Sequence, residues 1–349
     1  MVPGVLIFAI SFCLSYLGVG VFRRLSIENA LVDIPNERSS HSEPTPHGAG
    51  LLIAAICLMA YVPISILVTE RFSWGYVAGA ILVVFVSFLD DIRPIPFPYR
   101  LMVHSIAAIL LLVDLDTWHG ITMLGSLKFG VLGYVATFIW IVCMINCYNF
   151  MDGIDGLAGL QAVIAGIAWM VLAYMMHMPG LVLFSGVIAF TSLGFLLHNW
   201  NPARIFMGDV GATFFGFTFA ALPLLGRWMA ERSVDLLPIA AVLFVWLFIF
   251  DSGVTLIRRV LKGERFWTPH RQHMFQRLVS SGLSHRRVTA IYGILASILI
   301  ISVLMSVQFR EDIGLAMLPV VFVLNITLVI ICLRRGVMKK GSSQYLFIP

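Results

Sequence analysis

GAGLLIAAICLMAYVPISILVT at residues 48–69 and FSWGYVAGAILVVFVSFL at residues 72–89 contain no Asp, Glu, Lys or Arg. A helix needs about 20 mostly apolar residues to cross the hydrocarbon core of a membrane, and both segments are close to that length. Only Glu70 and Arg71 separate them. The pattern predicts two membrane-spanning helices joined by a short turn.

The rest of the chain repeats this pattern. Further apolar segments occur at 3–22, 101–118, 129–147, 157–177, 181–198, 211–226, 236–252, 289–308 and 314–333. Of the 349 residues, 60% are apolar and 12% are charged, whereas soluble domains are about 45–50% apolar and about 25% charged. The sequence therefore predicts an all-α polytopic membrane protein with about eleven transmembrane helices, forming one integral membrane domain over residues 1–349. The short, Gly-rich segment 211–226 is the weakest of the eleven.

The Lys and Arg residues indicate how these helices are oriented. With the N-terminus outside, 18 of the 23 basic residues fall on the inner side. The inner loops are then expected near 23–47, 90–100, 148–156, 199–210 and 253–288. Because inner loops are enriched in Lys and Arg, we expect the N-terminus outside and the C-terminus in the cytoplasm. The same distribution explains the net charge of +5, so no nucleic-acid partner is expected.

A pair of carboxylates lies at a predicted inner helix end. Asp90 and Asp91 close the third segment, in SFLDDIRPIP. Dehydrated and unpaired carboxylates at a membrane boundary cost several kcal/mol. We therefore expect Arg93, Arg100 or a divalent cation to balance them. An interfacial stop signal paired with Arg93 is the structural alternative.

A second polar block, NCYNFMDGIDGLAG at residues 146–159, combines amides, carboxylates and glycines. Asn146 and Asn149 are three residues apart, as are Asp152 and Asp155, so each pair shares a face if the segment is helical. Glycines let a backbone or a ligand approach closely. The block suits a nucleotide or a metal–phosphate group. A Gly-rich turn that caps the next helix is the alternative.

A third block, HNWNPARIFMGDVG at residues 198–211, places Asp209 between glycines at a loop-to-helix junction and includes Arg204. Mg²⁺ prefers one or two carboxylates together with waters and substrate phosphate oxygens. Asp209 is therefore a candidate ligand for a hard cation. A helix N-cap is an alternative that is compatible with that role.

Basic residues and histidines gather on two inner loops. They are Arg265, His270, Arg271 and His273 on the 253–288 loop, and Arg38 and His41 on the first inner loop. Such groups can neutralise a diphosphate, while a solvated positive loop is the alternative. Carboxylates with Mg²⁺ and surrounding cations suit phosphoryl transfer, and the membrane setting indicates a lipid substrate. Outside these loops, we expect substitution of His104 or His177 to have little effect.

These blocks resemble a known family. NCYNFMDGIDGLAG resembles the signature of the polyprenyl-phosphate N-acetylhexosamine-1-phosphate transferases, and FLDD at 88–91 and FMGDVG at 206–211 match two further family blocks. VDIPNERSSH…PTPHG at 32–48 resembles the first cytoplasmic loop of that family. The blocks occur in the family's order, and eleven spans fit its architecture of ten to eleven helices.

The resemblance implies an enzyme of the bacterial inner membrane that moves a sugar 1-phosphate from a UDP-sugar to undecaprenyl phosphate and releases UMP. It implies Mg²⁺ as cofactor, with Mn²⁺ as a second candidate, and it is compatible with a homodimer. It implies catalytic roles for Asp90, Asp91, Asp209 and His273, and metal binding by Asp209, Asp91 and Asp152. It implies substrate binding by Asn149, Asp152, Asp155, Arg38, His41, Arg204, Arg265, His270 and Arg271.

The basic arm departs from the family's common pattern. Phe275 and Gln276 stand where the family often has histidines, and His270 where it often has an acid. This variant resembles members that start O-antigen or capsule chains, as in lipopolysaccharide biosynthesis, with N-acetylated 6-deoxyhexosamines. A transporter that uses carboxylates for ion coupling is the alternative function. It would hold its acids near the bilayer midplane, whereas the acids of this chain are predicted at helix ends.

Overall fold

The computed structural model describes residues 2–28, 32–33, 44–118, 120–122, 126–230, 235–264, 271–309 and 313–344. The helices are α1 Val2–Glu28, α2 Ala49–Leu67, α3 Trp74–Ile92, α4 Phe97–Leu115, α5 Leu132–Met151, α6 Leu157–Met175, α7 Pro179–Asn199, α8 Gly208–Ala230, α9 Leu236–Phe244, α10 Trp246–Leu261, α11 Met274–Ser280, α12 His285–Gln308 and α13 Ile313–Gln344. Two short antiparallel pairs join β1 Val32–Asp33 to β2 Thr45–Pro46 and β3 Gly120–Thr122 to β4 Ser126–Lys128.

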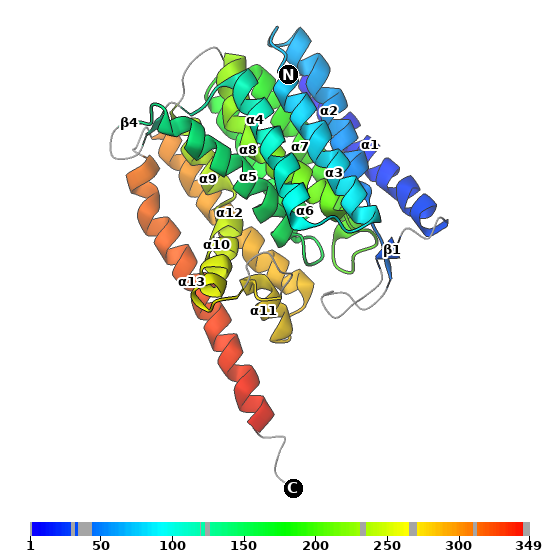
Figure 1. Cartoon of the computed structure of the whole chain (residues 1–349), viewed down its shortest axis with the longest axis vertical. Coiled ribbons are helices and arrows are strands. Elements are labelled where there is room, and N and C mark those ends of the chain that lie inside the picture. Colours follow the sequence, from blue (N-terminus) through cyan, green and yellow to red (C-terminus); the bar gives the residue numbers. More distant parts are fainter. Residues whose placement is uncertain are drawn as a thin grey trace.

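The helices form one elongated bundle (Figure 1). Within the described residues, ten of them are long and apolar enough to cross a membrane, and α9 with α10 makes an eleventh if that bent pair is one span. This confirms the predicted all-α polytopic membrane protein. Helices α10 and α11 lie at one end of the bundle, and α13 extends beyond the other helices at that end (Figure 1).

Helix α8 is the centre of the bundle. Of its most apolar segment, 89% of the residues are buried, against 17% for α1. The sequence made 211–226 the weakest span because it is short and rich in glycine, but the helix runs over 23 residues, from Gly208 to Ala230. Its small residues let neighbours approach closely, and a Cβ on Gly216 would lie 2.6 Å from the backbone oxygen of Met144 on α5.

The predicted span 236–252 is not a straight helix. It breaks at Val245, and the axes of α9 and α10 differ by 69°. Neither Gly nor Pro marks the break, which is why the sequence did not reveal it. The carbonyl of Phe244, released at the break, accepts a hydrogen bond from the side-chain amide of Gln161 on α6 (2.7 Å). The expected loop 253–288 correspondingly contains the rest of α10 and all of α11.

The start of α2 packs against the start of α8 with no room for a side chain. A Cβ on Gly50 would lie 2.1 Å from the nitrogen and 2.4 Å from the Cα of Gly211. Backbone atoms cannot rotate away as a side chain can, so the two helices would have to separate.

We expect Gly50→Ala to lower the free energy of unfolding by about 1–3 kcal/mol or more, as overpacked cores do. Thermal unfolding in detergent measures the change. Gly253→Ala is the matched control, since a Cβ at that helical position meets nothing within 4 Å. Equal unfolding midpoints for the two variants would contradict the close packing of α2 on α8.

Candidate active site

The four polar blocks of the sequence meet at one end of the bundle. Strand β2 and the start of α2 pair with the segment before α8: the N–H of Phe206 donates to the oxygen of Pro46 (2.8 Å), and that of Gly50 to the oxygen of Met207 (2.9 Å). Asp209 in the first turn of α8 contacts Asp91 in the last turn of α3. The 146–159 block joins the same region through Asp155, described below.

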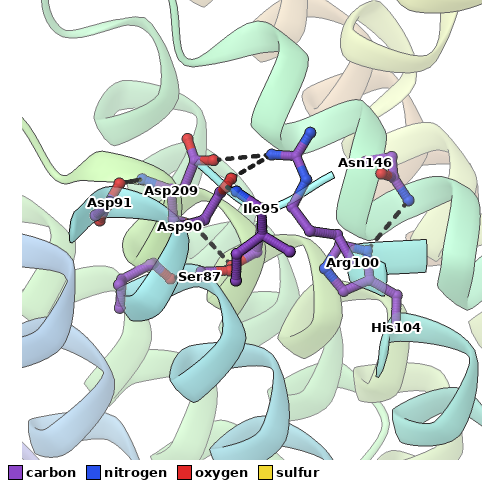
Figure 2. Close-up of polar contacts among 10 residues, drawn as sticks. Ser87, Asp90, Asp91, Ile95, Arg100, His104, Asn146 and Asp209 are labelled. Carbon is purple, nitrogen blue, oxygen red and sulfur yellow. Dashed lines mark hydrogen bonds and ion pairs between the residues drawn. The ribbon is translucent and has the colours of Figure 1, made fainter. Parts of the chain in front are cut away.

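Three carboxylates and one guanidinium form the centre of this region (Figure 2). The backbone N–H of Asp209 donates to Oδ1 of Asp91 (3.0 Å). The Arg100 guanidinium forms ion pairs with Asp90 and, at 3.4 Å, with Asp209. We call Asp90, Asp91, Asp209 and Arg100 the acidic cluster. Of the two arginines that the sequence left open as partners, Arg100 on α4 is the one that bridges two acids, while Arg93 is exposed.

Local sequence explains why the acids stand at the ends of their helices. Helix α3 ends at Ile92 because Arg93 precedes a proline, and a residue in that position disfavours helical geometry. The turn that follows brings the N–H of Ile95 to Oδ1 of Asp90 (2.6 Å). One turn before Asp91, the hydroxyl of Ser87 bonds to that of Thr213 on α8 (2.8 Å), which pins the two helices together.

Gly208 lets α8 begin against Asp91. Its φ is +73°, and a Cβ there would lie 2.7 Å from Oδ2 of Asp91. A side chain at this position would be strained and would also fill the space beside the carboxylate. Glycine therefore lets the start of α8 lie directly against this carboxylate.

The acidic cluster fits a hard cation. Oδ2 of Asp91 is buried and has no hydrogen-bond partner among the described residues. The atoms near it that could coordinate a metal are carboxylate oxygens. Within the same part of the chain, no three His, Cys, Asp or Glu side chains gather closely enough to hold a metal alone. Mg²⁺ needs fewer, because it is commonly bound by one or two carboxylates plus substrate phosphate oxygens. Asp91 and Asp209 are the residues placed to hold it.

Asp152 lies between this cluster and the turn that starts α6. The residue as a whole is half-buried, but its carboxyl group is shielded from water and lies near the negative charges of Asp91 and Asp155. Burial first, and then those two charges, raise the pKa of Asp152 to about 7. Such a carboxylate attracts a cation, which is consistent with the predicted support of a metal.

The raised pKa has a consequence for stability. Between about pH 4 and pH 7 the folded protein holds a proton on Asp152 that the unfolded chain has lost, so stability falls as pH rises through this window. We expect the unfolding midpoint of the wild type in detergent to fall from pH 5 to pH 8 more than that of Asp152→Asn. Parallel pH profiles for the two proteins would contradict the raised pKa.

Asp155 holds the site together rather than presenting a free carboxylate. Its Oδ2 accepts hydrogen bonds from the side-chain amide of Asn201 (2.7 Å) and the N–H of Ala203 (3.1 Å), and its Oδ1 lies 3.1 Å from Nδ1 of His285. Burial acts to raise the pKa of Asp155, but the hydrogen bonds from His285 and Asn201 outweigh it and lower the pKa. Asp155 thus joins the 146–159 and 198–211 blocks to the start of α12.

The other predicted residues occupy varied positions. Asn149 is half-buried, and its carbonyl accepts the N–H of Asp152 (3.3 Å). Arg204 and Arg271 are exposed, whereas His273 is buried against the rings of Phe150 and Phe275. Four predicted residues lie outside the described part of the chain: Arg38, His41, Arg265 and His270.

Two residues at this end of the bundle were missed by sequence reasoning. His104, one turn beyond Arg100 on α4, is buried and lies near the side-chain amide of Asn146, with Nδ1 to Nδ2 at 3.5 Å (Figure 2). It stands beside the acidic cluster, although the apolar run around it gave no sign of this. Asp251 on α10 is fully buried against His273. It looked like a single acid at the end of an apolar span.

Comparison with known proteins supports the family resemblance that the motifs indicate. Residues 73–227 match the family model of glycosyl transferase family 4. A probable undecaprenyl-phosphate N-acetylglucosaminyl 1-phosphate transferase of Bacillus subtilis is 29% identical, covering 99% of this chain and 96% of its own. A decaprenyl-phosphate N-acetylglucosaminephosphotransferase of Mycobacterium tuberculosis is 28% identical, covering 93% and 87%.

An undecaprenyl-phosphate alpha-N-acetylglucosaminyl 1-phosphate transferase of Yersinia pestis is 27% identical, covering 84% of this chain and 81% of its own. The match to the Bacillus subtilis protein covers 99% of the chain and so extends over all four polar blocks, while the family model covers the last three. The comparisons bear out the resemblance: the chain is similar to the family model and to polyprenyl-phosphate N-acetylglucosamine 1-phosphate transferases, the class that the motifs indicate.

Proposed function

We propose that this protein transfers an N-acetylhexosamine 1-phosphate from a UDP-sugar to undecaprenyl phosphate, giving undecaprenyl-diphosphate-sugar and UMP. The similarity to polyprenyl-phosphate N-acetylglucosamine 1-phosphate transferases supports sugar-phosphate transfer to a lipid. The observation that carries the proposal is the acidic cluster of Asp91, Asp209 and Arg100, in which Oδ2 of Asp91 has no hydrogen-bond partner among the described residues.

The reaction exchanges one phosphorus–oxygen bond for another. An oxygen of the lipid phosphate attacks the phosphorus that carries the sugar, and the bond from that phosphorus to the bridging oxygen breaks. The bridging oxygen leaves with UMP, and the sugar phosphate remains on the lipid as a diphosphate. No net proton transfer is required, so catalysis rests on positioning and on stabilising negative charge.

The chain's own residues meet that requirement. Asp91 and Asp209 would hold Mg²⁺, which supplies positive charge to the reacting phosphates. Arg100 adds a fixed cation at the same place, in ion pairs with Asp90 and Asp209. Arg204, in the 198–211 block, and Arg271, just before α11, are exposed, and the proposal assigns them to the diphosphate of the donor.

Direct attack by the lipid phosphate is favoured over a covalent aspartyl step. Asp90 uses Oδ1 to accept the N–H of Ile95 (2.6 Å) and Oδ2 to bind Arg100. A carboxylate with both oxygens engaged is a weak nucleophile, whereas the phosphate of the acceptor is already an anion. Asp90 therefore orients Arg100, and the lipid supplies the attacking oxygen.

The proposed location is a bacterial inner membrane, with the active site on the cytoplasmic face. The inner-side excess of basic residues, 18 of 23, supports an outside N-terminus and a cytoplasmic C-terminus. UDP-sugars reach the site from the cytoplasm in this arrangement. The transporter alternative has no support, because Asp90, Asp91 and Asp209 stand in terminal turns of their helices and not at a broken helix near the midplane.

The donor is tested with purified protein, undecaprenyl phosphate and Mg²⁺. UDP-GlcNAc, UDP-GalNAc and 6-deoxy UDP-N-acetylhexosamines are supplied separately, and mass spectrometry reads the lipid product. We expect the lipid to gain one N-acetylhexosamine phosphate, with a 6-deoxy donor used best if the altered arm selects the sugar for an O-antigen or a capsule. No lipid product from any donor, with the protein shown to be folded, would contradict the proposed function.

A further inference from the structure

Asp251 is a buried acid that the proposed reaction leaves without a role. It lies on α10, six residues after the break at Val245, and its side chain is fully buried. Burying a carboxylate is unfavourable unless hydrogen bonds satisfy its oxygens. The hydrogen-bond donors around Asp251 therefore indicate its role.

Its two oxygens gather donors from the start of α11, including His273, and from α12. Oδ1 accepts the N–H of Met274 (2.8 Å) and lies 3.3 Å from Nδ1 of His273, while Oδ2 accepts the N–H of Phe275 (3.1 Å) and the hydroxyl of Tyr292 (2.5 Å). Met274 and Phe275 are the first residues of α11, and their N–H groups have no partner within that helix. Asp251 thus fixes both the start of α11 and the ring of His273.

Helix α11 in turn lies directly on the turn that carries Asp152. A Cβ on Gly153 would be 2.9 Å from the ring of Phe275, so the glycine is what lets α11 approach. His273 also lies near Phe150, which is two residues before Asp152 in the sequence: the two ring centroids are 6.1 Å apart. The orientation of α11 therefore determines where His273 stands relative to Asp152.

We propose that Asp251 is a positioning residue that, with Tyr292, holds His273 and α11 against the Asp152–Gly153 turn in the geometry that sugar-phosphate transfer requires. The proposal rests on the proposed function for the part that His273 plays. Oδ1 of Asp251 lies 3.3 Å from Nδ1 of His273, and because a carboxylate oxygen only accepts, this contact favours the Nδ1–H tautomer and restrains the plane of the imidazole. A buried acid that only stabilised the fold would affect turnover without regard to His273.

A double-mutant cycle distinguishes a role of Asp251 that acts through His273 from a role in the stability of the fold alone. Asp251→Asn, His273→Ala and the double variant are assayed for UMP release with undecaprenyl phosphate and Mg²⁺. We expect each single variant to lose about 10- to 100-fold in kcat and the double variant to lose no more than the worse single variant. We expect the KM for undecaprenyl phosphate to stay within about twofold of wild type, since Asp251 is proposed to act on the transfer step through His273 and not on binding of the lipid. Losses that multiply in the double variant would overturn the proposal.

Asp114→Asn is the matched control. Asp114 also caps a neighbouring helix, since its Oδ2 accepts the hydroxyl of Ser73 (2.5 Å) and the N–H of Gly75 (3.0 Å) at the start of α3. That start lies about 25 Å from the acidic cluster at 1.5 Å per helical residue. This variant should lower the unfolding midpoint while leaving kcat near that of wild type. A kcat loss as large as that of Asp251→Asn would count against a specific role for Asp251.

Two further measurements do not depend on Asp251→Asn being active. Amide hydrogen exchange of residues 274–280 should be faster in that variant than in wild type, and unchanged exchange would overturn the proposal. Tyr292→Phe removes one donor and keeps the carboxylate, so it should cause a smaller loss that does not add to that of His273→Ala; an additive loss would overturn the proposal. If the wild type released no UMP, the proposed function would fail, while the exchange result would still test the positioning.

Discussion

Asp209→Asn is expected to fold and insert normally but to lose turnover by about 100- to 1,000-fold. Its carboxylate stands in the first turn of α8 beside Asp91, whose Oδ2 has no partner among the described residues. Removing a metal ligand costs several kcal/mol of transition-state stabilisation, and each 1.4 kcal/mol is about a factor of ten in rate. UMP release at saturating donor and lipid measures the effect.

The amide variant preserves the shape of the site, so the loss should appear in the rate and not in the fold. The hydrogen bond to Asp91 comes from the backbone N–H of residue 209 and survives the substitution. Asp116→Asn is the control, because Asp116 is also an exposed acid paired with an arginine at a helix end (Arg227, 3.8 Å). Near-normal turnover by Asp209→Asn would exclude it as a metal ligand.

Arg100→Met is expected to reduce turnover at least tenfold and to lower the free energy of unfolding by about 1–2 kcal/mol. The substitution leaves Asp90 and Asp209 without their shared cation. Removing one partner of a fully buried ion pair costs about 3–5 kcal/mol, but the side chains of Arg100 and Asp209 are 30% and 36% exposed, and solvent screening reduces that cost. Turnover and chemical unfolding in detergent measure the two effects.

Two variants make the Arg100 result specific. Arg100→Lys keeps the charge but lacks the fork that reaches two carboxylates, so an intermediate loss is expected. Arg93→Met removes the same charge from the exposed residue that follows α3 and should behave as wild type. If Arg93→Met and Arg100→Met lost activity equally, the effect would be one of net charge and not of the ion pairs.

Features that depend on local sequence could be predicted. The spans follow from apolar length, and Asp90, Asp91 and Asp209 were recognisable because acids at the ends of apolar segments need a partner. The order of the four blocks carried the family resemblance. The comparisons with known proteins confirm that resemblance.

Features that depend on contacts between distant segments could not be predicted. Nothing in the sequence chooses Arg100 over Arg93, because the choice depends on how α4 faces α3. The break at Val245 has no Gly or Pro, and Asp251 therefore looked like the end of a span instead of the anchor of α11. Helix α8 can lie at the centre of the bundle because its small residues allow its neighbours to pack closely, although they also lower its mean hydropathy.

Sugar-phosphate transfer to the lipid is measured by UMP release from UDP-GlcNAc, and from each other donor of the panel, by the purified protein. We expect UMP with at least one donor only when undecaprenyl phosphate and Mg²⁺ are both present, with a matching amount of lipid-diphosphate-sugar. UMP formed equally well without the lipid, or none formed by folded wild-type protein with any donor, would contradict it.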